Sequence, residues 1–208
     1  MYDGEKLNSI THLIGTAFSL IGLGALLAIG IQKQDVLLTI SFTIFGFTLV
    51  LLYTMSTLYH SFPPTRVKTI FQKLDHISIY LLIAGTYTPY MLVLLRDHGG
   101  LIILTLIWLL AIIGLLIDIF VRKRIEWLQI IIYLFMGWLC VINYGDLRDT
   151  LPKAGLIWLT AGGIAYTAGI IFYVLDNLNK LKHAHGVWHL FVLTGSLCHF
   201  ISISLYVR

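Results

Sequence analysis

Long apolar runs separated by short polar segments account for most of this chain. The runs cover residues 10–31, 36–59, 76–95, 101–121, 128–144, 155–175 and 187–207. Each is close to the about 20 residues that a helix needs to cross a bilayer core of about 30 Å. Backbone groups in lipid must be paired within the segment or in a closed barrel, and these runs lack the alternation of barrel strands. The pattern therefore predicts seven transmembrane helices.

Composition supports the same class of protein. The chain has 208 residues, of which 58% are hydrophobic and only 12% are charged. A soluble domain of this size carries about 25% charged residues. We therefore expect an all-α membrane protein in which residues 1–208 form a single seven-helix domain, with no room for a second folded unit.

The distribution of lysine and arginine predicts how this bundle is oriented. Seven spans place the termini on opposite sides, with nine Lys and Arg on the N-terminal side, including residues 122–124, and five on the other. The side richer in these residues is usually cytoplasmic, so we expect the N-terminus inside and the C-terminus outside. The net charge of +4 fits topology and lipid contact, and no basic face interleaved with aromatic residues suggests nucleic-acid binding.

Five polar side chains fall at one predicted depth. Ser56 and His60 lie at the end of the second span, Asp75 at the start of the third, and His185 and His189 at the start of the last. In a seven-span topology all of these ends face the cytoplasm. Ionisable groups within a membrane are costly and are usually functional, so their common depth indicates a site.

The spacing of these residues suits a zinc ion. His185 and His189 are four residues apart and share one helix face, while Ser56 lies one turn deeper than His60. Three imidazoles on a tetrahedral zinc leave one position for water, as in catalytic sites, whereas Mg²⁺ and Ca²⁺ prefer oxygen ligands. We predict His60, His185 and His189 as Zn²⁺ ligands. Asp75 would hold the water or take its proton, and Ser56 would orient a ligand or contact the substrate.

Simpler interpretations of the same residues stay open. A histidine pair four residues apart can arise by chance among eight histidines, and His60 and Asp75 could face lipid headgroups at the ends of their spans. His12, at the start of the first span, is a reserve ligand. His76 points about 100° away from Asp75 on a helix and more readily forms a hydrogen bond elsewhere.

The segment after the second span has two interpretations. Between residues 66 and 74, apolar side chains recur at helical spacing among basic ones. This pattern is typical of a short helix that lies in the membrane interface and would cover the site from the cytoplasmic side. The alternative is a flexible basic loop. Further along, Pro89 should kink the third span.

Several motifs together resemble a known family. They are Glu5–His12 (EKLNSITH), Ser56–His60 (STLYH), Leu74–Pro89 (LDHISIYLLIAGTYTP) and His185–His189 (HGVWH). In this order the chain resembles, over its whole length, the hemolysin III family. That family is the bacterial branch of the progestin and adipoQ receptor family, within a wider group of seven-helix hydrolases.

The resemblance implies roles for individual residues of this chain. In the receptor branch, the histidine of the SxxxH motif and both histidines of HxxxH bind zinc, and the aspartate opening the third span contacts the zinc water. These roles fall on His60, His185, His189 and Asp75 here, and the motif serine is Ser56.

The resemblance narrows the function to a few classes. Members are described as receptors, lipid amidases, cytolysins or regulators of membrane lipids. We expect a zinc-dependent hydrolase of lipid amides or esters at the cytoplasmic side of a bacterial plasma membrane, with membrane lipids as partners and an acyl chain entering laterally. A non-catalytic regulator of lipid composition with structural zinc, and a cytolytic protein, are the alternatives. The oligomeric state is left open.

Overall fold

The computed structural model describes residues 1–2, 4–121 and 125–208, so the basic residues 122–124 of the charge count lie outside the described residues. In the part of the chain that is described, the structure is helical without strands. Seven helical segments are long and apolar enough to cross a membrane. The predicted all-α, seven-helix membrane fold is confirmed.

Eight α-helices and three shorter helical turns build these seven segments. The α-helices are α1 (Lys6–Gln32), α2 (Val36–Ser61), α3 (Arg66–Pro89), α4 (Leu101–Phe120), α5 (Glu126–Trp138), α6 (Tyr144–Thr150), α7 (Lys153–Asn177) and α8 (Ala184–Tyr206). Two π-helical turns, Tyr90–Leu94 and Arg96–Gly100, connect α3 to α4, and a 3₁₀ turn, Leu139–Asn143, joins α5 to α6.

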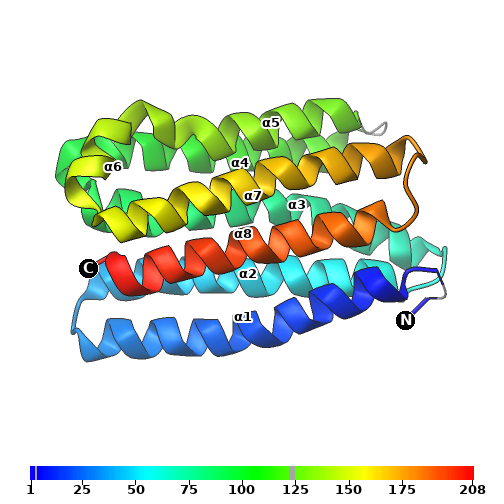
Figure 1. Cartoon of the computed structure of the whole chain (residues 1–208), viewed down its shortest axis with the longest axis horizontal. Coiled ribbons are helices and arrows are strands. Elements are labelled where there is room, and N and C mark those ends of the chain that lie inside the picture. Colours follow the sequence, from blue (N-terminus) through cyan, green and yellow to red (C-terminus); the bar gives the residue numbers. More distant parts are fainter. Residues whose placement is uncertain (3, 122–124) are drawn as a thin grey trace.

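The helices run side by side along one axis (Figure 1). Helix α8 packs against both α1 and α7, and α2 packs against α1 and α3. The two termini lie at opposite ends of the bundle, as an odd number of crossings requires (Figure 1). Which end faces the cytoplasm rests on the lysine and arginine count and stays a prediction.

The third span begins earlier than the sequence pattern suggested. Helix α3 starts at Arg66, so residues 66–74 form its first turns instead of a separate interfacial helix or a loop. The Thr65 side chain accepts a hydrogen bond from the Lys68 backbone N–H and begins the helix. No glycine or proline lies between Arg66 and Asp75 to end it, so this segment and the membrane span form one continuous rod.

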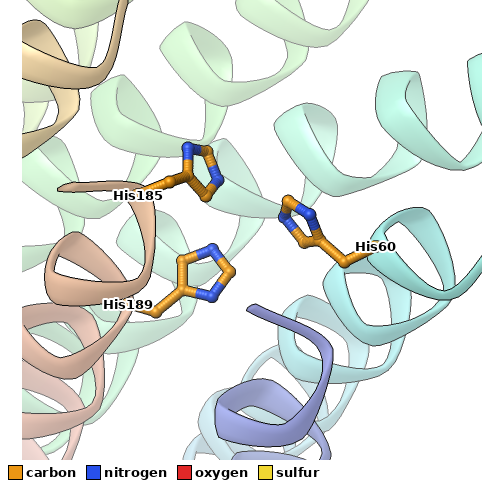
Figure 2. Close-up of side chains that lie close together, drawn as sticks. All are labelled: His60, His185 and His189. Atoms are coloured by element: carbon orange, nitrogen blue, oxygen red, sulfur yellow. The ribbon is translucent and has the colours of Figure 1, made fainter. Parts of the chain in front are cut away.

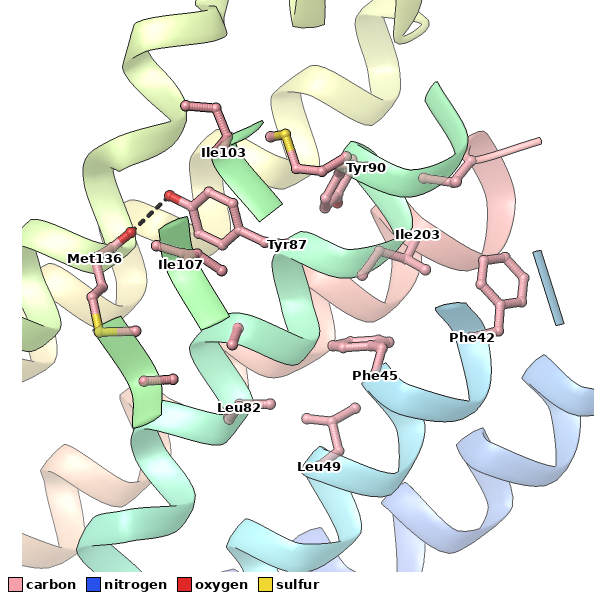
Figure 3. Packing of buried hydrophobic residues seen from close by; sticks show 14 of the residues in the cluster. Phe42, Phe45, Leu49, Leu82, Tyr87, Tyr90, Ile103, Ile107, Met136 and Ile203 are labelled. Carbon is pink, nitrogen blue, oxygen red and sulfur yellow. Dashed lines mark hydrogen bonds between the residues drawn. The ribbon is translucent and has the colours of Figure 1, made fainter. Parts of the chain in front are cut away.

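Two spans are interrupted near the middle of the bundle. Regular α-helix ends at Pro89, which lacks a backbone N–H, and the chain continues in a wider π-helical turn. The fifth span breaks after Trp138. There the Tyr87 hydroxyl donates to the Met136 carbonyl at 2.8 Å and accepts from the Cys140 N–H at 2.8 Å (Figure 3). The Tyr87 side chain thus forms hydrogen bonds with backbone groups that the break leaves unpaired and that lipid could not pair.

The apolar core occupies the half of the bundle that contains the start of α2. Phe42, Phe45 and Leu49 of α2 pack there with side chains of α3, α4 and α8, including Ile107 and Ile203 (Figure 3). The end of α2, with its polar residues, belongs to the opposite half. The core therefore aligns the helices without filling the end where the predicted site lies.

Small residues bring α7 and α8 into close contact. Gly155, Gly162 and Gly169, spaced seven apart, are buried on the face of α7 that meets α8. A Cβ atom added to Gly162 would lie 2.7 Å from Nε2 of His199. Such stripes let membrane helices approach closely, and this one sets the position of α8 with its two predicted ligands.

A pair of adjacent substitutions tests this packing. Gly162→Ala should lower the free energy of unfolding by about 1–3 kcal/mol, because the added methyl group overlaps a buried ring. Gly163→Ala is the matched control: its added Cβ comes no nearer than 3.8 Å to Trp138, and alanine is the better helix former. Thermal unfolding in detergent should rank Gly163→Ala at or above wild type. Equal melting temperatures for the two variants would contradict the close contact.

Candidate metal centre

Three histidines from two distant parts of the chain meet at one end of the bundle. His60 lies on the last turn of α2, and His185 and His189 lie on the first turns of α8. Their ring centroids form a nearly equilateral triangle, with separations of 4.9, 4.9 and 4.8 Å. One ligand nitrogen from each ring lies within 4.8 Å of the other two (Figure 2). The structure brings together the three histidines that the sequence predicted as metal ligands.

Two of the rings are oriented by carboxylates. His60 Nδ1 lies 2.5 Å from Oε2 of Glu5, and His185 Nδ1 lies 2.9 Å from Oδ2 of Asp176. Because an ionised carboxylate can only accept, both Nδ1 atoms carry the proton. The Nε2 atom of each ring is then left with a free lone pair, which is the state in which histidine binds a metal.

The third ring is oriented by the backbone of α1. His189 Nδ1 lies 3.3 Å from the carbonyl oxygen of Asn8 and 3.3 Å from the Thr11 hydroxyl. A carbonyl oxygen also only accepts, so this Nδ1 carries a proton as well. The first turns of α1 thus belong to the site.

The three free lone pairs belong to atoms that are shielded from solvent. The Nε2 atoms of His60, His185 and His189 are buried and have no hydrogen-bond partner among the described residues. Each such orphaned group costs about 1–3 kcal/mol, so a bound cation is the simplest way to satisfy them. Ligands of a tetrahedral zinc lie about 3.4 Å apart, given Zn–N bonds of about 2.0–2.1 Å. The nitrogens here lie within 4.8 Å of one another, so binding would draw the rings closer together.

Glu5 is the charged group that connects this site to the surface. Its carboxylate contacts His60 and also Lys68 Nζ, the latter at 2.5 Å. Burial alone would raise the pKa of the Glu5 carboxyl, but hydrogen bonds with His60 and Lys68 lower that pKa to about 2. Glu5 is therefore ionised at neutral pH and places a negative charge behind His60.

The predicted catalytic residues lie near the histidines but outside their group of three. Asp75 is 5% exposed on α3 and lines an internal cavity, and Ser56 is 1% exposed on α2, one turn deeper than His60. Their roles as proton acceptor and orienting hydroxyl stay predictions.

His12 and His76, the other two histidines considered from the sequence, lie in different places. The ring of His12 stacks on His189, with centroids 3.6 Å apart and an interplanar angle of 11°. His12 thus lies outside the group of three and lines the same cavity as Asp75. His76 is buried on α3, and its carbonyl accepts a hydrogen bond from Tyr133 at 3.1 Å.

The cavity has a volume of about 440 Å³ and runs among α3, α5, α7 and α8. Its walls are mostly leucine, isoleucine, valine and aromatic side chains, and Asp75, His12 and Trp188 lie at the end near the histidines. Because His12 stacks on His189, the cavity reaches the back of the ligand group.

Sequence reasoning did not identify the groups that orient the ligands. Glu5, Asn8 and Thr11 contact the site, and they recur every three residues at the start of α1, which was an available signal. Asp176, at the end of α7, lies nine residues before His185. It is an acidic residue at the same end of the bundle as the histidines.

Comparison with known proteins agrees with the motifs. The family described as Haemolysin-III related matches residues 2–200. The chain belongs to this family. A haemolysin III relative from Bacillus cereus, Hemolysin-3, is 40% identical over 203 residues, which cover 98% of this chain and 91% of that protein. The Hemolysin-3 homolog of Bacillus subtilis (strain 168) is 41% identical, covering 97% of this chain and 93% of its own length.

More distant similarity extends this haemolysin III relationship to animals. The human monocyte to macrophage differentiation factor is 30% identical over 171 residues, covering 79% of this chain and 69% of its own length. No solved structure matches the chain.

Proposed function

We propose that this haemolysin III protein is a zinc-dependent hydrolase of lipid amide or ester bonds at the cytoplasmic side of a bacterial plasma membrane. The observation that supports it best is the set of three buried, unpartnered Nε2 atoms beside a large apolar cavity. A zinc ion bound there would polarise a carbonyl group and lower the pKa of a bound water molecule, so that the water could attack at neutral pH.

The chain supplies the groups that such a reaction needs. Asp75 lines the cavity at its polar end, where its carboxylate can take a proton from water and return it to the departing amine or alcohol. Ser56 is buried beneath His60 and can orient the carbonyl group with its hydroxyl. Both groups lie away from the cytoplasmic surface, which keeps the site dry and strengthens these interactions.

The cavity suits the acyl chain of a lipid. Its lining includes Trp138, Val141 and Tyr144, which are also 40%, 57% and 50% exposed on the outer surface of the bundle. Residues that face both the cavity and the surroundings mark a lateral opening on the side of α5. An acyl chain can enter there from the bilayer while its amide or ester group reaches Asp75.

A second candidate is a non-catalytic metal site in a regulator of membrane lipids. Among the described residues that line the cavity, none is one of the three histidines. A metal held there would tie α2 to α8 and could stabilise a bundle whose cavity senses lipid composition. The two candidates share the metal and differ in whether a substrate is turned over.

Metal content tests the part common to both candidates. Protein purified in detergent should contain about one zinc ion per chain, and a His185→Ala/His189→Ala double variant should contain almost none, because it loses two of three ligands. His98→Ala is the matched control, since His98 is exposed at the other end of the bundle. Zinc content would be measured by mass spectrometry. Equally low zinc content in wild type and both variants would show that these histidines do not form a metal centre.

Turnover separates the two candidates. Asp75→Asn should retain zinc but release fatty acid from a long-chain amide at least about 100-fold more slowly, because it loses the proton acceptor. The exposed Asp97→Asn variant should match wild type. Free fatty acid would be measured by mass spectrometry. Zinc-loaded wild type that releases no more fatty acid than Asp75→Asn would favour the regulator.

A further inference from the structure

The side chain of Lys68 joins three segments at the end of the bundle that holds the histidines. Its Nζ donates to Oε1 of Glu5 at 2.5 Å and to the Phe62 carbonyl at 3.4 Å. The same Nζ lies 4.9 Å from the ring centre of Tyr59 and 5.4 Å from that of Tyr2. Only 13% of this lysine side chain is exposed, so its position is well defined by these contacts.

Glu5 divides its two oxygens between Lys68 and the metal centre. Oε1 accepts from Lys68, and Oε2 accepts from His60 Nδ1 at 2.5 Å. Glu5 immediately precedes α1 and its side chain does not cap that helix. The contact with Lys68 is thus what holds one carboxylate oxygen while the other orients the ring.

We propose that Lys68 is a positioning residue of the metal centre, which acts through Glu5 to hold His60 in the orientation that points Nε2 at the ion. The proposal rests on the metal site of the proposed function and is independent of whether the protein hydrolyses a lipid.

The placement of Lys68 on α3 extends this role to the predicted proton acceptor. Lys68 and Asp75 are seven residues apart, so they share one face of α3 and differ by about 10 Å along its axis. Through Glu5, the ion pair of Lys68 therefore links α3, which carries Asp75, to His60 on α2.

A purely electrostatic role and a positioning role of Lys68 predict opposite changes in zinc affinity when its side chain is replaced. Loss of a nearby positive charge should strengthen the binding of a divalent cation. Loss of a group that orients a ligand through hydrogen bonds should weaken metal binding by about 10–100-fold. The sign of the change in zinc affinity therefore distinguishes a positioning residue from a surface charge.

The experiment compares zinc dissociation constants by competition with a chelator, on full-length protein in detergent. Lys68→Met and Glu5→Gln should each weaken binding by about tenfold or more. Lys68→Arg should stay within a few-fold of wild type, because it keeps the donor and the charge. Lys73→Met, which removes an exposed lysine from the same helix, is the matched control and should bind as wild type. Lys68→Gln is measured in parallel as a milder variant, with the same expectation as Lys68→Met.

A double variant tests whether Lys68 acts through Glu5. Glu5→Gln/Lys68→Met should bind zinc as weakly as Glu5→Gln alone, since both changes remove one connected set of bonds. Three results would each overturn the proposal. The first is equal zinc affinity in Lys68→Met, Lys68→Gln and Lys73→Met. The second is tighter zinc binding in the Lys68 variants, and the third is additive loss of zinc affinity in the double variant. If wild type binds zinc no better than His185→Ala/His189→Ala, the histidines do not form a metal centre, and Lys68 then has no positioning role.

Discussion

Lone pairs on buried nitrogens that lie close to one another need a hydrogen-bond donor or a cation between them. In this bundle, acceptor oxygens of Glu5, Asp176 and Asn8 hold the protons of three imidazoles on Nδ1. The three Nε2 atoms are therefore buried acceptors, and none of them has a hydrogen-bond partner among the described residues. At the surface, bulk water would solvate these nitrogens at low cost, whereas buried nitrogens need a partner inside the protein. This constraint supports the proposed metal centre more directly than does the presence of histidine itself.

The architecture supplies what this constraint requires. An odd number of spans brings the start of α1, the end of α2 and the start of α8 to one end of the bundle (Figure 1). The glycines of α7 set α8 close enough for Asp176 to reach His185. At the other end, the apolar core aligns the helices, and the cavity, which several core residues line, offers space for a lipid chain.

The sequence was sufficient for the spans and for the meeting of the three histidines, because both follow from strong local rules. Apolar runs of membrane length predict helices, and the topology then places His60 level with His185 and His189. The start of α3 was predicted too late, because a basic amphipathic segment resembles an interfacial helix until its continuity with the next span is known. Glu5 and Asp176 were missed because hydrogen bonds between distant segments depend on helix rotation, which apolar periodicity in a mostly apolar helix does not define. The cavity follows from gaps in packing, for which no single residue is a signal.

X-ray absorption at the zinc edge of the purified protein tests the central claim most directly, because it reports the atoms around the ion. The account predicts three imidazole nitrogens at about 2.0–2.1 Å and one further oxygen. A shell of oxygens alone, or one that includes sulfur from Cys140 or Cys198, would show that the ion is bound elsewhere and would contradict the account.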